Sequence, residues 1–255
     1  MSRETLLDVT FTADELAAVD VTGTAVVVVD VLRATTTITA ALGAGAAGIW
    51  AVGSPEEARG LGVKWGAVTA GERGGRQIAD LDLGNSPVEH ATPRTAGRCI
   101  ALTTSNGTRT IGLAADAPVI LLGCFNNRAA VADALADLDL PKILIACAGT
   151  SGGRRISPED VLFAGELVDR WTRCGVYCTG GAMVARGYAR GESGDLVEML
   201  RDFPAGRNLL ELGYGADLEW AGRRDSTSVV PRVTSRSTPG APPFITLEGR
   251  ASPCR

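Results

Sequence analysis

The sequence predicts an α/β protein in three layers, α/β/α, with a mostly parallel sheet and additional C-terminal helices. Short apolar runs alternate with helical patterns up to about residue 173, and this alternation is typical of a parallel sheet covered on both faces. Val26–Val29 are four consecutive valines, as expected of a strand buried on both faces. With 255 residues and no sharp break in composition, the chain is long enough for one large domain.

Local signals indicate where the expected helices begin. Thr12 is suited to cap a short helix over residues 13–19. Ser54-Pro55-Glu56-Glu57 begins a helix, because serine caps the amino end, proline fits the first turn and the acids favour the helix dipole. Residues 157–160 repeat this Ser-Pro-acid-acid pattern. In chain order we expect strands at 5–11, 24–30, 47–52, 67–70, 98–103, 118–122 and 142–147, and further helices at about 35–45, 55–64, 108–115, 127–138 and 158–173.

The pattern changes in the C-terminal part of the chain. Helical segments are expected near residues 181–202 and 206–222, where they form a helical cap. We therefore assign residues 1–233 to a single domain, with its helical C-terminal part at about 178–222. Ser, Thr, Pro and Gly dominate residues 234–255, so this segment is expected to be an irregular or disordered tail. The apolar helices either cover the core or form a homodimer surface.

Composition argues against several classes of protein. The 29 acidic and 25 basic residues give a pI near 5.2, so no sequence-wide basic surface is available to attract nucleic acid. Charges interrupt the first 20 residues and no run approaches a membrane span, so we expect a cytoplasmic protein. The six cysteines form no CxxC pair, and we expect most of them to be reduced. The single histidine, His90, excludes a multi-histidine metal site and is expected at the surface.

Five polar turns follow expected strands, and their residues are candidates for one functional site. The carboxyl ends of parallel strands share an edge, where the amino ends of the following helices favour an anion. Asp30 and Arg33 stand in the first turn with three threonines, which is typical of an active site. The alternative is that Asp30 caps the helix and pairs with Arg33. The turns comprise residues 30–37, 71–76, 103–108, 123–127 and 148–155.

Acidic residues in and near these turns indicate metal-assisted hydrolysis. With only one histidine, hydrolysis would depend on carboxylates that hold a hard cation such as Mg²⁺. Each acid also has a structural alternative, which is a pair with a nearby arginine, a turn or a favourable helix dipole. Thr103–Thr108 offers hydroxyls, an amide and a glycine to phosphate oxygens, with a helix cap as its alternative. The candidate acids are Asp30, Glu72, Asp82, Glu159 and Asp160.

Several blocks occur in a fixed order along the chain. They are Asp30–Thr37, Gly71-Glu72-Arg73, Asp82–Pro87, Thr103–Thr108, Asn126, and Cys147-Ala148-Gly149 with Glu159-Asp160. Together they closely resemble the 2-phosphosulfolactate phosphatase (ComB) family over about residues 5–175. One departure is Asp80-Leu81, where the family pattern has Gly-Phe. After residue 175 the resemblance is weaker, apart from Asp217 and Val230-Pro231.

The resemblance implies a magnesium-dependent phosphatase acting on phosphate esters of 2-hydroxycarboxylic acids. The reaction it implies converts (2R)-2-phospho-3-sulfolactate to 3-sulfolactate and phosphate, in coenzyme M biosynthesis. Asp30, Arg33 and Glu72 are then expected to be catalytic, with Asp30 as either metal ligand or nucleophile. Substrate or phosphate binding is expected from Thr35, Thr36, Arg73, Asn85, Ser86, Ser105, Asn106, Thr108 and Asn126, and Mg²⁺ binding from Asp30, Glu72, Glu159 and Asp160.

Two other functions are compatible with the same residues. One is a cysteine-dependent α/β amidohydrolase that uses Cys147, with Asp30 as its base and Lys142 nearby. The other is a non-catalytic protein that binds phosphorylated metabolites.

Overall fold

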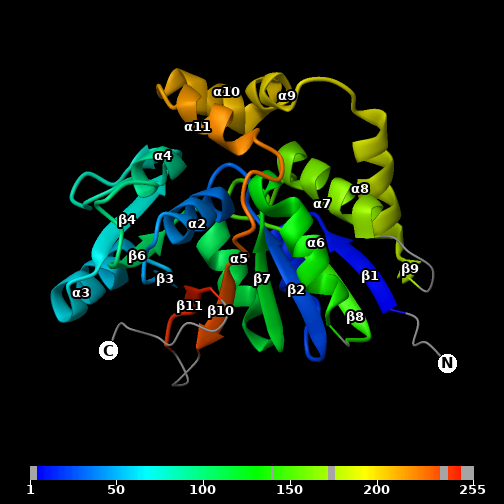
Figure 1. Ribbon diagram of the computed structural model, residues 1–255, viewed down its shortest axis with the longest axis horizontal. Helices are drawn as coiled ribbons and strands as arrows, with labels where there is room; N and C mark the ends of the chain where they lie inside the picture. Colours follow the sequence, from blue (N-terminus) through cyan, green and yellow to red (C-terminus); the bar gives the residue numbers. More distant parts are fainter. Residues whose placement is uncertain (1–4, 139, 172–175, 236–240, 248–255) are drawn as a thin grey trace.

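The computed structural model describes residues 5–138, 140–171, 176–235 and 241–247, which form one sheet flanked by helices (Figure 1). The sheet is mixed and mostly parallel, so the predicted α/β class is confirmed. Its strand order is β5-β4-β6-β3-β11-β10-β7-β2-β8-β1-β9. The strands are β1 (Thr5–Thr10), β2 (Thr24–Val29), β3 (Gly48–Ala51), β4 (Val68–Arg73), β5 (Arg76–Gln77), β6 (Cys99–Thr103), β7 (Val119–Gly123), β8 (Lys142–Cys147), β9 (Val176–Cys178), β10 (Arg232–Ser235) and β11 (Phe244–Thr246).

Helices cover both faces of the sheet, and the valines of β2 show how. Val27 and Val29 belong to an apolar cluster with α6, α7 and α8, whereas Val26 and Val28 belong to a second cluster with α1, α2 and α5. Successive side chains of a strand point to opposite faces, so the valine run is buried on both. The helices are α1 (Ala13–Leu16), α2 (Ala34–Gly43), α3 (Pro55–Trp65), α4 (Pro87–His90), α5 (Gly107–Leu113), α6 (Arg128–Ala136), α7 (Pro158–Trp171), α8 (Gly180–Gly191), α9 (Leu196–Asp202), α10 (Pro204–Glu211) and α11 (Gly215–Ala221), with 3-10 turns at Ala114–Asp116 and Phe125–Asn127.

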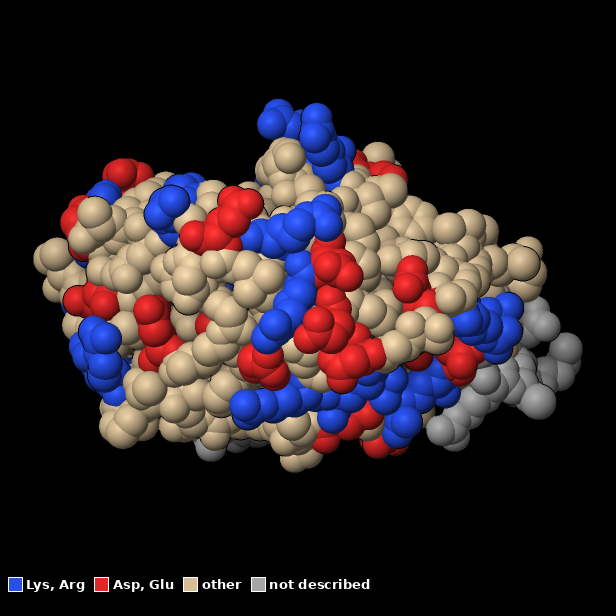
Figure 2. Space-filling view, turned by 90° about the horizontal axis from the view of Figure 1, so that it is seen from above, with Lys and Arg blue, Asp and Glu red and all other residues tan. Residues whose placement is uncertain are grey.

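The two expected C-terminal helices are each divided in two. The first of these helices is interrupted between α8 and α9, and α9 begins after Asp195, whose side chain accepts a hydrogen bond from Glu198 N and so caps the helix. Gly213, at φ +84°, lies between α10 and α11. The helical cap consists of α9, α10 and α11, which lie over the end of the sheet where β2 turns into α2 (Figure 1). The first part of the predicted cap, α8, instead packs against α7 and β1. Arg201 of α9 pairs with Glu219 of α11 at 2.5 Å, and the face seen from above carries acidic and basic side chains next to each other (Figure 2).

The β10–β11 hairpin corrects the prediction of an irregular tail from residue 234. Both strands lie inside the sheet, where they pair antiparallel with each other and with β7 and β3. Phe244–Thr246 is buried, and the Phe244 ring packs against Trp50 with centroids 5.1 Å apart. The tail prediction is wrong for this segment because β11 needs only the three residues Phe244–Thr246 to fit between neighbouring strands, and so short a strand does not stand out in the sequence. Residues 236–240 and 248–255 of the predicted tail lie outside the described part of the chain.

His90 also differs from the expectation of a surface residue. It is buried at the end of α4, and its Nε2 lies 3.2 Å from the Gly84 carbonyl oxygen. Burial lowers the pKa of His90 to about 4. Cys124, Cys147 and Cys178 are free thiols, whereas Cys99 is disulfide-bonded. In the residues that the structure describes, no helix has the length and apolar character needed to span a membrane.

Candidate active site

The loops that follow four strands meet the helical cap around a cavity of about 650 Å³. The strand-following loops contribute residues after β2, β4, β6 and β8, and α10 closes the side facing the helical cap. This convergence is what the polar turns predict. We call this hollow the acidic cavity, because Asp30, Glu72 and Glu159 line it. The other lining residues that matter here are Arg33, Asn85, Ser105, Asn106, Arg155 and Asn208.

Asp30 follows β2 directly and is buried beside the amino end of α5. Its Oδ1 accepts a hydrogen bond from Ala34 N at 3.2 Å, and Gly107 N–H also donates to the carboxylate. A Cβ at position 107 would lie 2.6 Å from Asp30 Oδ2, so only glycine allows this approach. Burial, together with the neighbouring charge of Glu72, raises the pKa of Asp30 to about 6 against the opposing hydrogen bond from Ala34.

Glu72, at the end of β4, is held by main-chain donors. Its Oε1 accepts from Ser105 N at 2.7 Å and its Oε2 from Gly75 N at 2.7 Å. Ser105 Oγ also donates to Oε2, at 3.3 Å. Two loops that are separate in sequence are therefore fixed to one carboxylate at the cavity wall.

Glu159 and Asp160 begin α7 but have different environments. Asp160 Oδ1 accepts from Val31 N at 2.8 Å and Oδ2 from Gly149 N at 3.2 Å, so this side chain ties the loop after β2 to the loop after β8. Glu159 lines the cavity, and its buried Oε2 has no hydrogen-bond partner among the described residues. Burial raises the pKa of Glu159 to about 7, with a further contribution from the charge of Asp30. Glu159 is therefore the carboxylate with an oxygen left over for a ligand.

Arg33 lines the same cavity and is held by the helical cap. Its Nη1 donates to Asp217 Oδ2 at 2.9 Å, and its Nη2 donates to Gly75 O at 2.6 Å. The guanidinium lies 4.4 Å from the centre of the Tyr214 ring, which is a cation–π distance. Ser86 Oγ donates to the second oxygen of Asp217 at 2.5 Å.

Several of the predicted site residues do not line the cavity. Thr35 Oγ1 donates to Gly123 O at 2.8 Å and Thr36 Oγ1 to Val31 O at 2.7 Å, so both fix the first turn from inside. Asn126 Nδ2 donates to Trp220 O and Arg223 O at 2.8 and 3.0 Å, which anchors the chain after α11. Ser86 and Asp160 likewise bind other protein groups.

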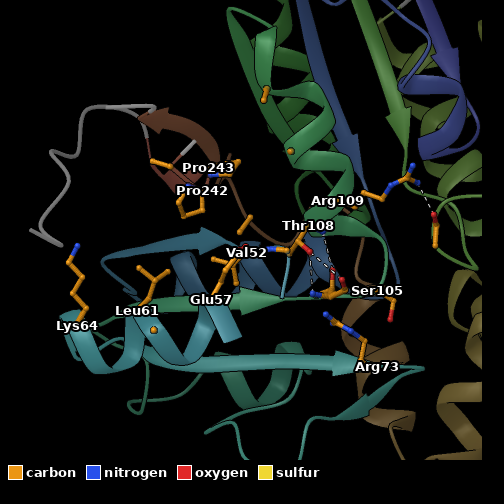
Figure 3. A pocket seen from close by; sticks show the side chains of 18 of the residues that line it. Val52, Glu57, Leu61, Lys64, Arg73, Ser105, Thr108, Arg109, Pro242 and Pro243 are labelled. Carbon is orange, nitrogen blue, oxygen red and sulfur yellow. Dashed lines mark hydrogen bonds between the residues drawn. The ribbon is translucent and has the colours of Figure 1, made fainter. Parts of the chain in front are cut away.

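Arg73 and Thr108 face a neighbouring hollow of about 1430 Å³ between α3 and α5 (Figure 3). Arg73 Nη2 donates to Thr103 Oγ1 at 3.0 Å, and Thr108 Oγ1 donates to Thr104 O at 3.2 Å. Ser105 and Gly152 line both hollows. The larger hollow therefore adjoins the acidic cavity but contains none of its carboxylates.

Some residues that shape the site were absent from the sequence prediction. Tyr214 and Asn208 come from the helical cap and Arg155 from the loop after β8. Asn208 and Tyr214 lie more than a hundred positions from the turns they contact, so no local pattern marks them. Arg155 stood inside a predicted polar turn, and its place in that turn is the signal that would have identified it.

The carboxylates would suit a magnesium ion only if the substrate supplied part of its coordination. Among the residues with described positions, no three His, Cys, Asp or Glu side chains are close enough to hold an ion by themselves. Magnesium commonly takes only one or two carboxylates and fills its remaining positions with water and substrate phosphate. Asp30 and Glu159 repel each other in a buried site, and Glu159 Oε2 has no partner, so both would be stabilised by a cation.

Cys147 does not have the environment of a nucleophile. It is fully buried on β8 and does not line the acidic cavity. Burial raises the pKa of its thiol well above the usual value, and nearby acids raise it further, so the reactive thiolate is disfavoured. This environment argues against the cysteine-dependent amidohydrolase.

The fold and the site define an α/β protein with carboxylates and an arginine gathered at the strand ends, as in a hydrolase acting on an anionic ester. The family model described as 2-phosphosulpholactate phosphatase matches residues 10–236. The chain therefore belongs to this family, which is one of hydrolases of phosphoric monoesters.

Curated relatives agree with this assignment. A "Probable 2-phosphosulfolactate phosphatase" of Thermotoga petrophila is 36% identical over 209 residues, covering 82% of this chain and 88% of the relative. Proteins of the same name from Carboxydothermus hydrogenoformans and Synechocystis are 38% identical over 209 residues and 33% over 215 residues. These matches cover 81% and 82% of this chain and 85% and 88% of the relatives.

Proposed function

We propose that this chain is a magnesium-dependent phosphatase for phosphate esters of 2-hydroxycarboxylic acids, with (2R)-2-phospho-3-sulfolactate as its substrate. The products would be 3-sulfolactate and inorganic phosphate. The observation that carries the proposal is that Arg33 and three carboxylates, Asp30, Glu72 and Glu159, line one cavity. The names of the relatives support the choice of substrate.

Within the cavity, the proposed roles follow from the surroundings of each side chain. Arg33 binds the phosphate, because a guanidinium offers several donors to phosphate oxygens. Asn85 lines the cavity and would donate from its amide N–H groups to an acid group of the substrate, whereas its buried Oδ1, which has no partner in the described part of the chain, can only accept a hydrogen bond. Glu72 keeps the loop of Ser105 and Asn106 beside the substrate through its main-chain hydrogen bonds.

Asp30 and Glu159 are the residues that would hold magnesium, and Asp30 can instead attack phosphorus directly. Magnesium, when bound, would neutralise phosphate charge. As nucleophile, Asp30 would form a bond from a carboxylate oxygen to phosphorus while the bond to the 2-hydroxyacid oxygen breaks and that oxygen takes a proton from water. Water would then attack the acyl phosphate, releasing inorganic phosphate and restoring the carboxylate. Borohydride trapping of an acyl phosphate on Asp30 during turnover would identify the nucleophile, and its absence would leave the role of ligand.

The test is phosphate release from 2-phosphosulfolactate and from 2-phospholactate, with magnesium and with excess EDTA. Asp30→Asn should abolish most release while the protein stays folded. Asp80→Asn is the matched control, because Asp80 is an exposed acid paired with Arg59 at 2.7 Å. Release that persists in EDTA would refute the metal dependence, and ligand binding without release would indicate a binding protein.

A further inference from the structure

Arg33 is held from the far end of the chain by Asp217, and both side chains are buried. The arginine is 3% exposed and the aspartate 2%, with 2.9 Å between Nη1 and Oδ2. Asp217 comes from α11 in the helical cap, 184 positions after Arg33. Arg33 lines the acidic cavity, whereas Asp217 does not. The charge of the aspartate therefore lies behind the arginine and not among the ligand-facing groups.

We propose that Asp217 is a positioning residue for Arg33, so that the helical cap is part of the phosphate-binding machinery. Tyr214 and Ser86 complete this arrangement: the ring lies against the guanidinium and the hydroxyl fixes the second carboxylate oxygen. The inference rests on the proposed function, in which Arg33 binds the phosphate. It assigns to residues 214–217 a role that the strand-end turns alone do not supply.

The physical reason is that a free arginine loses much rotamer freedom when it binds an anion. Three contacts hold the guanidinium before any ligand arrives: Asp217 Oδ2, Gly75 O and the Tyr214 ring. Of the five N–H groups of a guanidinium, the bonds to Asp217 and Gly75 use two. A preset group with unused donors binds phosphate at a smaller entropic cost and in a fixed orientation.

A second ion pair, which is more exposed than the first, provides a comparison outside the cavity. Asp225 lies just after the helical cap, and it pairs with Arg128 of α6 at 2.6 Å. Like Asp217, it ties the C-terminal part of the chain to the start of a helix that packs on the sheet. Neither Asp225 nor Arg128 lines the acidic cavity. Loss of this pair should therefore lower the stability of the fold without changing the affinity for phosphate.

The experiment compares Asp217→Asn, Arg33→Ala, their double variant and Asp225→Asn in the full chain. Two quantities are measured: kcat/KM for ester hydrolysis with magnesium, and the Kd of inorganic phosphate by calorimetry. We expect Asp217→Asn to lower kcat/KM by about 100-fold and to weaken phosphate binding in parallel, because displacements of about 1 Å have effects of this size. In the Arg33→Ala background the same change should have an effect of about twofold or less. Asp225→Asn should match the wild type in both measurements.

Three results would overturn the proposal: wild-type behaviour of Asp217→Asn, losses that multiply in the double variant, or an equal loss in Asp225→Asn. If Asp217→Asn does not fold, Tyr214→Leu replaces it, because Tyr214 is only half-buried; it should weaken phosphate binding only when Arg33 is present. A wild type that binds phosphate but hydrolyses neither ester refutes the proposed function, and the phosphate Kd values then decide the role of Asp217. A wild type that binds no phosphate overturns the role of Asp217.

Discussion

Gly107→Ala adds one methyl group at the point where α5 approaches the candidate nucleophile or metal ligand. The new Cβ would lie 2.5 Å from the Ala34 Cβ and 2.6 Å from Asp30 Oδ2. Distances below 3.0 Å are essentially never seen for real Cβ atoms, so α2, α5 or the Asp30 carboxylate must move. The two helices are packed in the core, and the carboxylate is therefore the group most free to shift.

The size of the effect follows from that clash. Overpacking by one methyl group in a well-packed interior costs about 1–3 kcal/mol of unfolding free energy. A shift of Asp30 by about 1 Å is enough to reduce kcat/KM by about 100-fold. Gly112→Ala is the matched control on the same helix, because a Cβ there meets nothing within 4 Å. Replacing a helical glycine by alanine stabilises by about 0.5–1 kcal/mol, so this control should be slightly more stable and fully active.

The assay combines denaturant unfolding with steady-state phosphate release for both variants. The expected pattern is a loss of stability and activity in Gly107→Ala and neither loss in Gly112→Ala. Gly107→Ala with wild-type stability and turnover would refute the close approach of α5 to Asp30. Equal losses in the two variants would show a general sensitivity of α5 instead of a clash at Asp30.

Two further predictions concern pH. His90 has a folded pKa of about 4 against an ordinary value of 6.5, so the unfolded chain binds a proton that the native protein does not. The free energy of unfolding should therefore fall by up to about 3 kcal/mol from pH 6.5 to pH 4, and His90→Gln should remove most of this fall in denaturant unfolding. Glu159 is shifted the other way, to about 7 from 4.5, so its contribution is complete below pH 4.5 and lost as the pH rises to 7. Without metal, Glu159→Gln should gain stability relative to the wild type over that pH window. Magnesium at pH 7 should raise the melting temperature of the wild type more than that of the variant. A parallel pH dependence of stability in the two proteins would contradict the raised pKa of Glu159.

Local patterns predicted the parts of the fold that local chemistry controls. Ser54 and Pro55 begin α3 as expected, since a serine side chain accepts from Glu57 N and proline occupies the first turn. The valines of β2 are buried on both faces because neighbouring strands and helices enclose them. The convergence of the strand-following loops on one cavity was also predicted, since it follows from the topology of parallel strands.

The remainder depends on contacts between distant parts of the chain. No pattern in the sequence near Phe244 indicates that β11 inserts between β3 and β10 in the sheet. The burial of His90 and the pairing of Asp217 with Arg33 arise from packing that only the folded chain provides. For the same reason the sequence places Thr35 and Asn126 among the substrate-binding residues, although the Thr35 hydroxyl and the Asn126 amide donate to main-chain carbonyls. A polar residue in the right turn identifies the site, but its direction is set by tertiary structure.

The surroundings of the four buried acids distinguish those that hold the structure from those that can react. Burying carboxylates close together is costly unless donors stabilise the charge. Both oxygens of Glu72 and of Asp160 accept hydrogen bonds from main-chain N–H groups, so these two carboxylates hold loops in place. Burial raises the pKa of Asp30, Glu159 and Asp160 alike, but Asp30 and Glu159 line the acidic cavity, Asp160 does not, and Glu159 Oε2 has no partner in the described chain. A cation, or a proton taken from the substrate, would offset the buried charge of these two acids. We therefore expect Asp30 and Glu159 to be the reacting groups and Glu72 and Asp160 to be structural supports.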